Sequence, residues 1–235
     1  MLLYLVRHGD PNYKLDCLTE RGKLEAEALA LRMKASRIDT VYSSPMGRAR
    51  ETAEPTCRLL KKPCLIEEWT HEVLSERLTT YPTGEPVSVS GLQNTLLREN
   101  GEINIPFEKT FTSKALRETE MEKAFVYIRD NGRVFLEKLG YREENGIYRI
   151  LRKNEDRVAL FTHAVFTRVW LSEMLHIPLH LMWASFTPTH TGVTILEFKN
   201  NADGVTAPKV LCFSDMSHLY ANGPDMTHDN DVIDL

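Results

Sequence analysis

Short apolar segments that alternate with helical segments constrain the fold of this chain more than any other feature. The pattern assigns strands to residues 2–6, 38–45 and 63–69 and helices to residues 18–36 and 48–62. The order strand, helix, strand, helix, strand is typical of a parallel sheet whose strands are joined by helical crossovers. The first part of the sequence therefore predicts an α/β fold.

Two predicted helices contain residues that interrupt helices. Pro55 lies inside the segment 48–62, and we expect it to kink this helix or to divide it into two pieces. A further helix is predicted at roughly 116–139, and the pair Asn131 and Gly132 marks a place where it could break. The exact course of both helices is therefore open at this point.

The pattern is lost between about 73 and 115, where turn residues and polar residues show no sustained period. A connection of this length without regular structure is uncommon in a compact domain unless it has a function, and we interpret it as a lid. The pair Asn145–Gly146 then predicts a hairpin. We expect one domain over 1–235 with a lid or insertion at about 73–150.

The last third of the chain returns to strands and helices. Residues 157–175 predict a strand that runs directly into a helix, with His163 at the junction. Residues 192–198 and 207–215 predict two closing strands. The sheet therefore contains strands from both ends of the chain.

Composition and charge exclude several classes of protein. The chain has 42% hydrophobic and 26% charged residues, which is ordinary for a globular protein with a sizeable core. Its net charge of −4 offers no bulk attraction for nucleic acid or for anionic membranes. No apolar run is long enough to span a membrane, and the N-terminus does not read as a signal peptide. The four scattered cysteines indicate free thiols, so we expect a cytoplasmic protein.

Polar residues follow each of the main predicted strands, at the point where the strand ends. They are Arg7-His8-Gly9, the run Ser43 to Arg50, the group Glu67, Glu68, His71 and Glu72, and the pair Thr162-His163. Because the carboxyl ends of parallel strands meet at one edge of a sheet, we expect these side chains to converge there.

This set of side chains suits phosphoryl transfer through a histidine. An imidazole nitrogen can attack phosphorus and form a covalent phosphohistidine. Arginine guanidinium groups donate paired hydrogen bonds to phosphate oxygens, and a second histidine can stabilise charge there. A carboxylic acid can give a proton to the leaving alkoxide and later take one from water. Two arginines and a histidine can neutralise the phosphate, so we expect no metal and no other cofactor.

Four motifs carry a resemblance to a known family. "LVRHG", "LTERG" followed by "EA", "VYSSPMGRARETA" and "LFTHAVFTR" resemble the histidine phosphatase superfamily, the phosphoglycerate mutase-like group. The matching blocks span residues 3–57 and 157–175. The resemblance implies a three-layer α/β/α sandwich with a mainly parallel central sheet, and an insertion that forms a lid over the pocket.

The resemblance also implies a role for the residues that match its motifs. His8 becomes the nucleophile, Arg7 and Arg48 grip the phosphate, and His163 becomes the second histidine of the phosphate pocket. The proton donor of the family follows the third strand. We assign this role to Glu72 and keep Glu68 as the alternative.

Other positions are less well defined by the motifs. Many members of the family carry a phosphate-binding asparagine shortly after the R-H-G run, where this chain has Lys14, so Asn12 is a substitute for it. Thr191 could contact the phosphate through its backbone or its hydroxyl group. His190 could reach the edge of the pocket or could be an ordinary turn residue.

These residues predict a hydrolase, namely a metal-independent phosphatase that acts through phosphohistidine on a small phosphorylated metabolite and releases inorganic phosphate. The N-E-R-x-Y-G run of phosphoglycerate mutases is absent, which favours a phosphatase. Two alternatives stay open. One is a phosphotransferase of the mutase type, and the other is a non-catalytic member that binds phosphorylated ligands. The sequence gives neither the substrate nor the oligomeric state.

Overall fold

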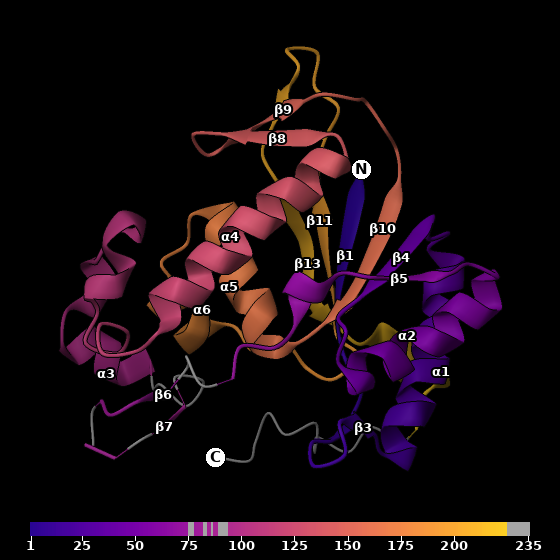
Figure 1. The fold of residues 1–235 in the computed structure, drawn as a ribbon, viewed down its shortest axis with the longest axis horizontal. Helices are drawn as coiled ribbons and strands as arrows, with labels where there is room; N and C mark the ends of the chain where they lie inside the picture. The colour runs from indigo at the N-terminus through magenta and orange to yellow at the C-terminus, as the bar shows by residue number, and fades with distance from the viewer. Residues whose placement is uncertain (75–77, 82–83, 86, 89–93, 225–235) are drawn as a thin grey trace.

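A mixed six-stranded sheet forms the centre of the computed structural model, which describes residues 1–74, 78–81, 84–85, 87–88 and 94–224 (Figure 1). Its strands, in spatial order, are β13 (Lys209–Asp215), β11 (Val193–Glu197), β1 (Leu2–Arg7), β10 (Arg157–Thr162), β4 (Thr40–Ser43) and β5 (Cys64–Ile66). Strands β1, β10, β4 and β5 pair in parallel, whereas β11 runs antiparallel to both β1 and β13. The predicted mainly parallel sheet is therefore confirmed.

Helices cover both faces of this sheet (Figure 1). One face carries α1 (Glu20–Ala35) and α2 (Gly47–Leu60), with α7 (Ser217–Asn222) packed on α1; the other carries α4 (Met121–Lys138), α5 (Ala164–Leu175) and α6 (Leu179–Ser185). Strand β1 alternates between the two: Tyr4 and Val6 join the core under α1 and α2, and Leu3 and Leu5 join the core under α4 and α5. The three-layer α/β/α arrangement follows from this burial on both faces.

Two helices differ from the sequence prediction. Helix α2 is one helix from Gly47 to Leu60 with Pro55 buried inside it, so the alternative of two separate pieces is wrong. Helix α4 also runs without a break through Gly132. A Cβ atom at Gly132 would lie 2.4 Å from Nε1 of Trp170, so glycine here permits α4 to pack closely against α5.

The segment predicted to lack regular structure is in part regular. It contains strands β6 (Leu78–Thr79) and β7 (Val87–Ser88), helix α3 (Asn94–Glu99), and 3-10 helices at Glu102–Asn104 and Phe107–Thr112. Helix α3 packs against α6. Part of the expected lid, residues 75–77, 82–83, 86 and 89–93, lies outside the described residues.

Smaller strands complete the fold. Strands β8 (Tyr141–Glu144) and β9 (Ile147–Ile150) form the predicted hairpin, and Asn145 and Gly146 both have positive φ as its turn requires. Strand β12 (Val205–Thr206) pairs with β9, and β2 (Pro11–Asn12) pairs with β3 (Cys17–Leu18) beyond the end of β1. All four cysteines are free. In the described parts of the chain, no helix is both long and apolar enough to cross a membrane.

A buried carboxyl group lies between α4, α5 and the β8–β9 hairpin. Glu173 is 4% exposed, and its Oε1 lies 3.5 Å from Nε of Arg133, which also pairs with Glu143 at 3.0 Å. Burial raises the pKa of Glu173 to about 7, although Arg133 opposes the shift. The folded protein therefore holds this proton more tightly than the unfolded chain does.

We expect the Glu173 carboxyl group to make the folded protein less stable as pH rises. Because the pKa of Glu173 is raised in the folded protein, the contribution of its proton to the free energy of unfolding is fully present below about pH 4.5. This contribution is lost as pH rises to about 7. At about pH 8, Glu173→Gln should raise the free energy of unfolding by about 2 kcal/mol, and at about pH 5 by much less. Urea unfolding at both pH values measures this, with the exposed Glu137→Gln as the control. Equal effects of Glu173→Gln at both pH values would contradict the prediction.

Candidate active site

The backbone of His8 is fixed on both sides by neighbouring segments. Its N–H donates to the Thr162 carbonyl group at 2.9 Å, and its own carbonyl group accepts from the Thr191 N–H at 3.2 Å. The ring is 1% exposed, and its Nδ1 lies 2.8 Å from the Gly9 carbonyl oxygen. Because a carbonyl group can only accept, Nδ1 carries the proton, and Nε2 keeps its lone pair.

Two arginine side chains lie in the same region. Arg7, beside His8, donates from Nη1 to the Pro188 carbonyl group at 2.8 Å, and its Nε is buried without a partner among the described residues. Arg48 lies in the first turn of α2 and forms an ion pair with Asp16. Asp16 also accepts from the Gly47 N–H at 2.7 Å, so it ties Arg48 to the start of its helix. Both guanidinium groups are held in place by the protein.

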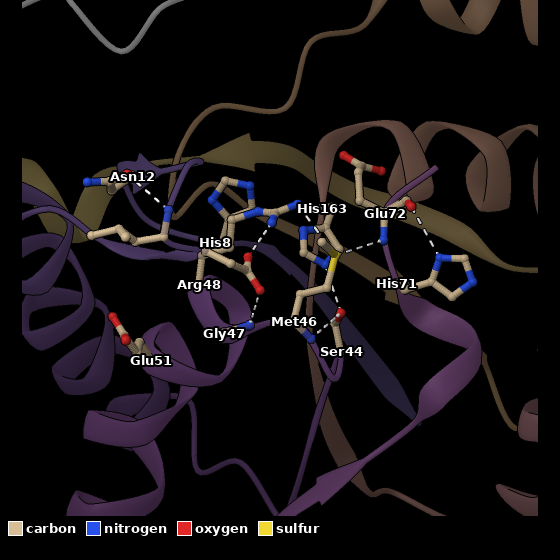
Figure 2. Close-up of polar contacts among 12 residues, drawn as sticks. His8, Asn12, Ser44, Met46, Gly47, Arg48, Glu51, His71, Glu72 and His163 are labelled. Carbon is tan, nitrogen blue, oxygen red and sulfur yellow. Dashed lines mark hydrogen bonds and ion pairs between the residues drawn. The ribbon is translucent and has the colours of Figure 1, made fainter. Parts of the chain in front are cut away.

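His163 lies at the junction of β10 and α5 and is fully buried. Its ring centroid is 5.3 Å from that of His8, and Figure 2 shows the two rings in the same region as Arg48. His163 Nε2 lies 2.8 Å from the Ser44 hydroxyl oxygen, which accepts from the Met46 N–H at 3.3 Å. Either atom of this pair can be the donor. When Ser44 donates to Nε2, the proton of His163 is on Nδ1, a buried atom with no partner in the described structure.

Glu72 lies against the first turn of α5 (Figure 2). Its Oε1 accepts from the N–H groups of Val73 and Phe166 at 3.0 and 2.9 Å, and its Oε2 accepts from Val165 at 3.2 Å. The carboxyl group is thus oriented by the helix that begins after His163. Glu68, the alternative proton donor, is exposed in the neighbouring 3-10 helix Glu68–Thr70.

The other two predicted phosphate-binding residues face different partners. Asn12 is exposed, and its side-chain oxygen accepts from the Leu15 N–H at 3.2 Å, so its side chain lies apart from His8 and Arg48 (Figure 2). The Thr191 hydroxyl group donates to the His190 carbonyl group at 2.8 Å and lies 3.0 Å from Nε2 of His218. In this structure, Thr191 contacts the nucleophile candidate only through its backbone N–H.

Burial and nearby cations keep the imidazole groups neutral. The pKa of His8 is well below its usual range, first because the ring is buried and then because Arg7 lies next to it. The pKa of His163 is also well below its usual range, owing to burial and then to the charges of His8 and Arg48. A neutral His8 with a free Nε2 lone pair has the form that nucleophilic attack requires.

His190 is a third histidine in this cluster, and the strand-end pattern did not identify it. Its ring centroid lies 5.6 Å from that of His8, and the residue is 1% exposed. The pattern followed the ends of parallel strands, whereas His190 precedes the antiparallel strand β11. Because Val193 pairs with Val6, the beginning of β11 lies at the same edge as the end of β1. A closing strand that runs antiparallel to β1 is therefore the sequence signal that points to a residue such as His190.

The arrangement of these side chains suits a doubly charged anion next to an imidazole nitrogen that keeps its lone pair. Two guanidinium groups and the His163 N–H can bind phosphoryl oxygens, and the Glu72 carboxyl group can exchange a proton. Within the part of the chain that the structure describes, no group of three or more histidine, cysteine, aspartate or glutamate side chains could hold a metal ion.

A family model matches most of the chain. The model describes the histidine phosphatase superfamily (branch 1) and matches residues 3–83 and 106–208. No curated protein sequence matches the chain.

Several solved structures have the same fold. Phosphoserine phosphatase from Entamoeba histolytica, in complex with 3-phosphoglyceric acid, is 19% identical with a TM-score of 0.61 and covers 93% of this chain and 98% of its own. Mycobacterial glucosyl-3-phosphoglycerate phosphatase with inorganic phosphate is 15% identical with a TM-score of 0.61 and covers 92% and 98%. YhfR from Bacillus stearothermophilus is 22% identical with a TM-score of 0.59 and covers 93% and 98%. At these identities the likeness establishes the fold.

The protonation state of His8 can be tested directly. We expect the ring to stay neutral at about pH 5.5, with its proton on Nδ1, because burial and Arg7 oppose a second proton. Nitrogen-15 NMR of histidine-labelled protein measures both properties, and His8→Ala identifies the signal by removing it. A His8 signal that titrates with an ordinary pKa, or that shows the proton on Nε2, would contradict the expectation.

Proposed function

The chain belongs to the histidine phosphatase superfamily, and we propose that it is a metal-independent phosphomonoester hydrolase that works through phosphohistidine at His8. One observation carries the proposal. The His8 ring is buried and neutral, donates from Nδ1 to the Gly9 carbonyl group, and so keeps Nε2 unprotonated beside Arg7 and Arg48. This is the state of a histidine prepared to attack phosphorus.

In the first step, His8 Nε2 attacks the phosphorus atom of the ester. A bond forms between nitrogen and phosphorus while the bond from phosphorus to the ester oxygen breaks. Arg7, Arg48 and the Nδ1–H of His163 bind the phosphoryl oxygens and stabilise the charge in the transition state. The leaving alkoxide takes a proton from the carboxylic acid of Glu72 and departs as an alcohol.

In the second step, water attacks the phosphohistidine. The Glu72 carboxylate takes a proton from the water as its oxygen bonds to phosphorus. The bond between nitrogen and phosphorus breaks, inorganic phosphate leaves, and Nε2 of His8 recovers its lone pair. The arginine and histidine side chains supply the positive charge that the reaction needs, so the mechanism uses no metal ion.

A small phosphorylated metabolite is the proposed substrate. The compared structures include a phosphoserine phosphatase and a glucosyl-3-phosphoglycerate phosphatase, which act on small esters. The net charge of −4 also disfavours nucleic acid as a substrate. The free cysteines agree with a reducing compartment, and we place the protein in the cytoplasm.

The nucleophile is tested by hydrolysis of p-nitrophenyl phosphate in EDTA. The native chain should release phosphate, and His8→Ala should lower kcat by roughly a thousandfold or more because the covalent route is lost. Thermal unfolding of both proteins shows whether the fold is intact. Turnover that survives His8→Ala, or that EDTA abolishes, would reject this mechanism.

The proton donor is tested by a matched pair of variants. Glu72→Gln keeps an oxygen that can accept from the start of α5 but cannot supply a proton, so kcat should fall roughly a hundredfold or more for an alkyl phosphate. The loss should be smaller for p-nitrophenyl phosphate, whose leaving group needs little protonation. Glu68→Gln, at an exposed position, is the control and should keep native kinetics. The reverse ranking of the two variants would assign the role to Glu68.

A further inference from the structure

His190 lies in a loop whose backbone is bonded to the end of β1. The Thr191 N–H donates to the His8 carbonyl group, and the Arg7 N–H donates to the Gly192 carbonyl group, both at 3.2 Å. The Arg7 side chain donates to the Pro188 carbonyl group at 2.8 Å. These three bonds hold the loop against the nucleophile, so the position of the His190 ring is fixed by the fold.

Both ring nitrogens of His190 are buried without a hydrogen-bond partner among the residues that the structure describes. Oδ1 of Asp10 lies 3.8 Å from Nδ1, which is beyond hydrogen-bond distance. Native proteins rarely leave a buried polar group unpaired, because each one costs about 1–3 kcal/mol. An imidazole without a partner among these residues is therefore available to bond to a ligand.

The surroundings of the ring show which partner suits it. Burial first, and then the nearby charges of Arg7 and Arg21, lower the pKa of His190 to about 2. Asp10 is the acidic group that faces the ring. The imidazole is thus neutral, with one N–H to donate, and lies in a region of positive potential. An anion with several oxygens, bound beside His8, would accept this hydrogen bond and balance the cations.

We propose that His190 is a phosphate-contacting residue, which donates a ring N–H to an oxygen of the phosphoryl group bound at His8. The inference rests on the proposed function, since it takes the phosphate to lie at His8. It adds a third histidine to the two that the family resemblance identifies. His190 binds the transferred group, while Arg7 holds both the phosphate and the loop that carries His190.

The test is the affinity for inorganic phosphate, measured by isothermal titration calorimetry without any turnover. His190→Phe keeps a ring of similar shape but has no N–H, and should weaken phosphate binding roughly tenfold or more. His190→Asn keeps an N–H donor and should recover part of the affinity. His176→Asn, at the left-handed residue that ends α5, is the control and should bind phosphate like the native chain.

Thermal unfolding separates this role from a purely structural one. His190→Phe removes no hydrogen bond among the residues that the structure describes, so its Tm should equal or exceed that of the native chain. In nitrogen-15 histidine-labelled native protein, phosphate should also shift the ring signals of His190, a measurement that needs no folded Phe variant.

Three results would overturn the inference. They are native phosphate affinity in His190→Phe, weaker binding in both variants together with a lower Tm, and His190 signals that do not respond to phosphate. If the native chain hydrolyses esters through His8 while one of these is observed, only this inference fails. If the native chain binds no phosphate, the proposed function fails with it.

Discussion

Two arginine guanidinium groups beside buried imidazole rings set the electrostatics of the whole site. Arg48 has a counter-charge in Asp16, whereas the Arg7 side chain donates to an uncharged carbonyl group. Burial, and then the charge of Arg7, hold the pKa of His8 well below its usual range, so the imidazole is neutral. In the proposed function the local excess of positive charge binds a doubly charged anion, although the chain as a whole carries a net charge of −4. A local field thus overrides the overall charge.

The order of strands explains why His8 is held so firmly. Strand β1 lies between β10 and β11, so both of its edges are paired, and both of its faces are buried under helices. At its end the backbone of His8 bonds to Thr162 on one side and Thr191 on the other. A histidine held in this way needs little reorganisation to act as the proposed nucleophile. Glu72, by contrast, is oriented through the first turn of α5.

Sequence periodicity was sufficient to predict the layers of the fold. It also predicted that His8, Arg48 and His163 converge, because parallel strands end at a common edge of the sheet. It could not show how side chains orient themselves within loops, so the exposure of Asn12 appears only in the structure. It also misjudged α2, since a helix packed on the sheet tolerates one proline. The role of His190 stayed open because His190 precedes an antiparallel strand. Such a strand has its first residues, and not its last, at this edge of the sheet.

The reversed direction of β11 has a consequence for how such a pocket can change over evolutionary time. At this edge of the sheet, the loops after β4 and β10 lead directly into helices α2 and α5, whose packing restricts the sequences of those loops. The loop at 188–192 leads directly into a strand, and its bonds to β1 are made largely by backbone atoms. These bonds would survive a change of side chain at position 190, whose ring lies 5.6 Å from that of His8. Such a change would alter the surroundings of the His8 ring and leave the backbone of His8 held in place.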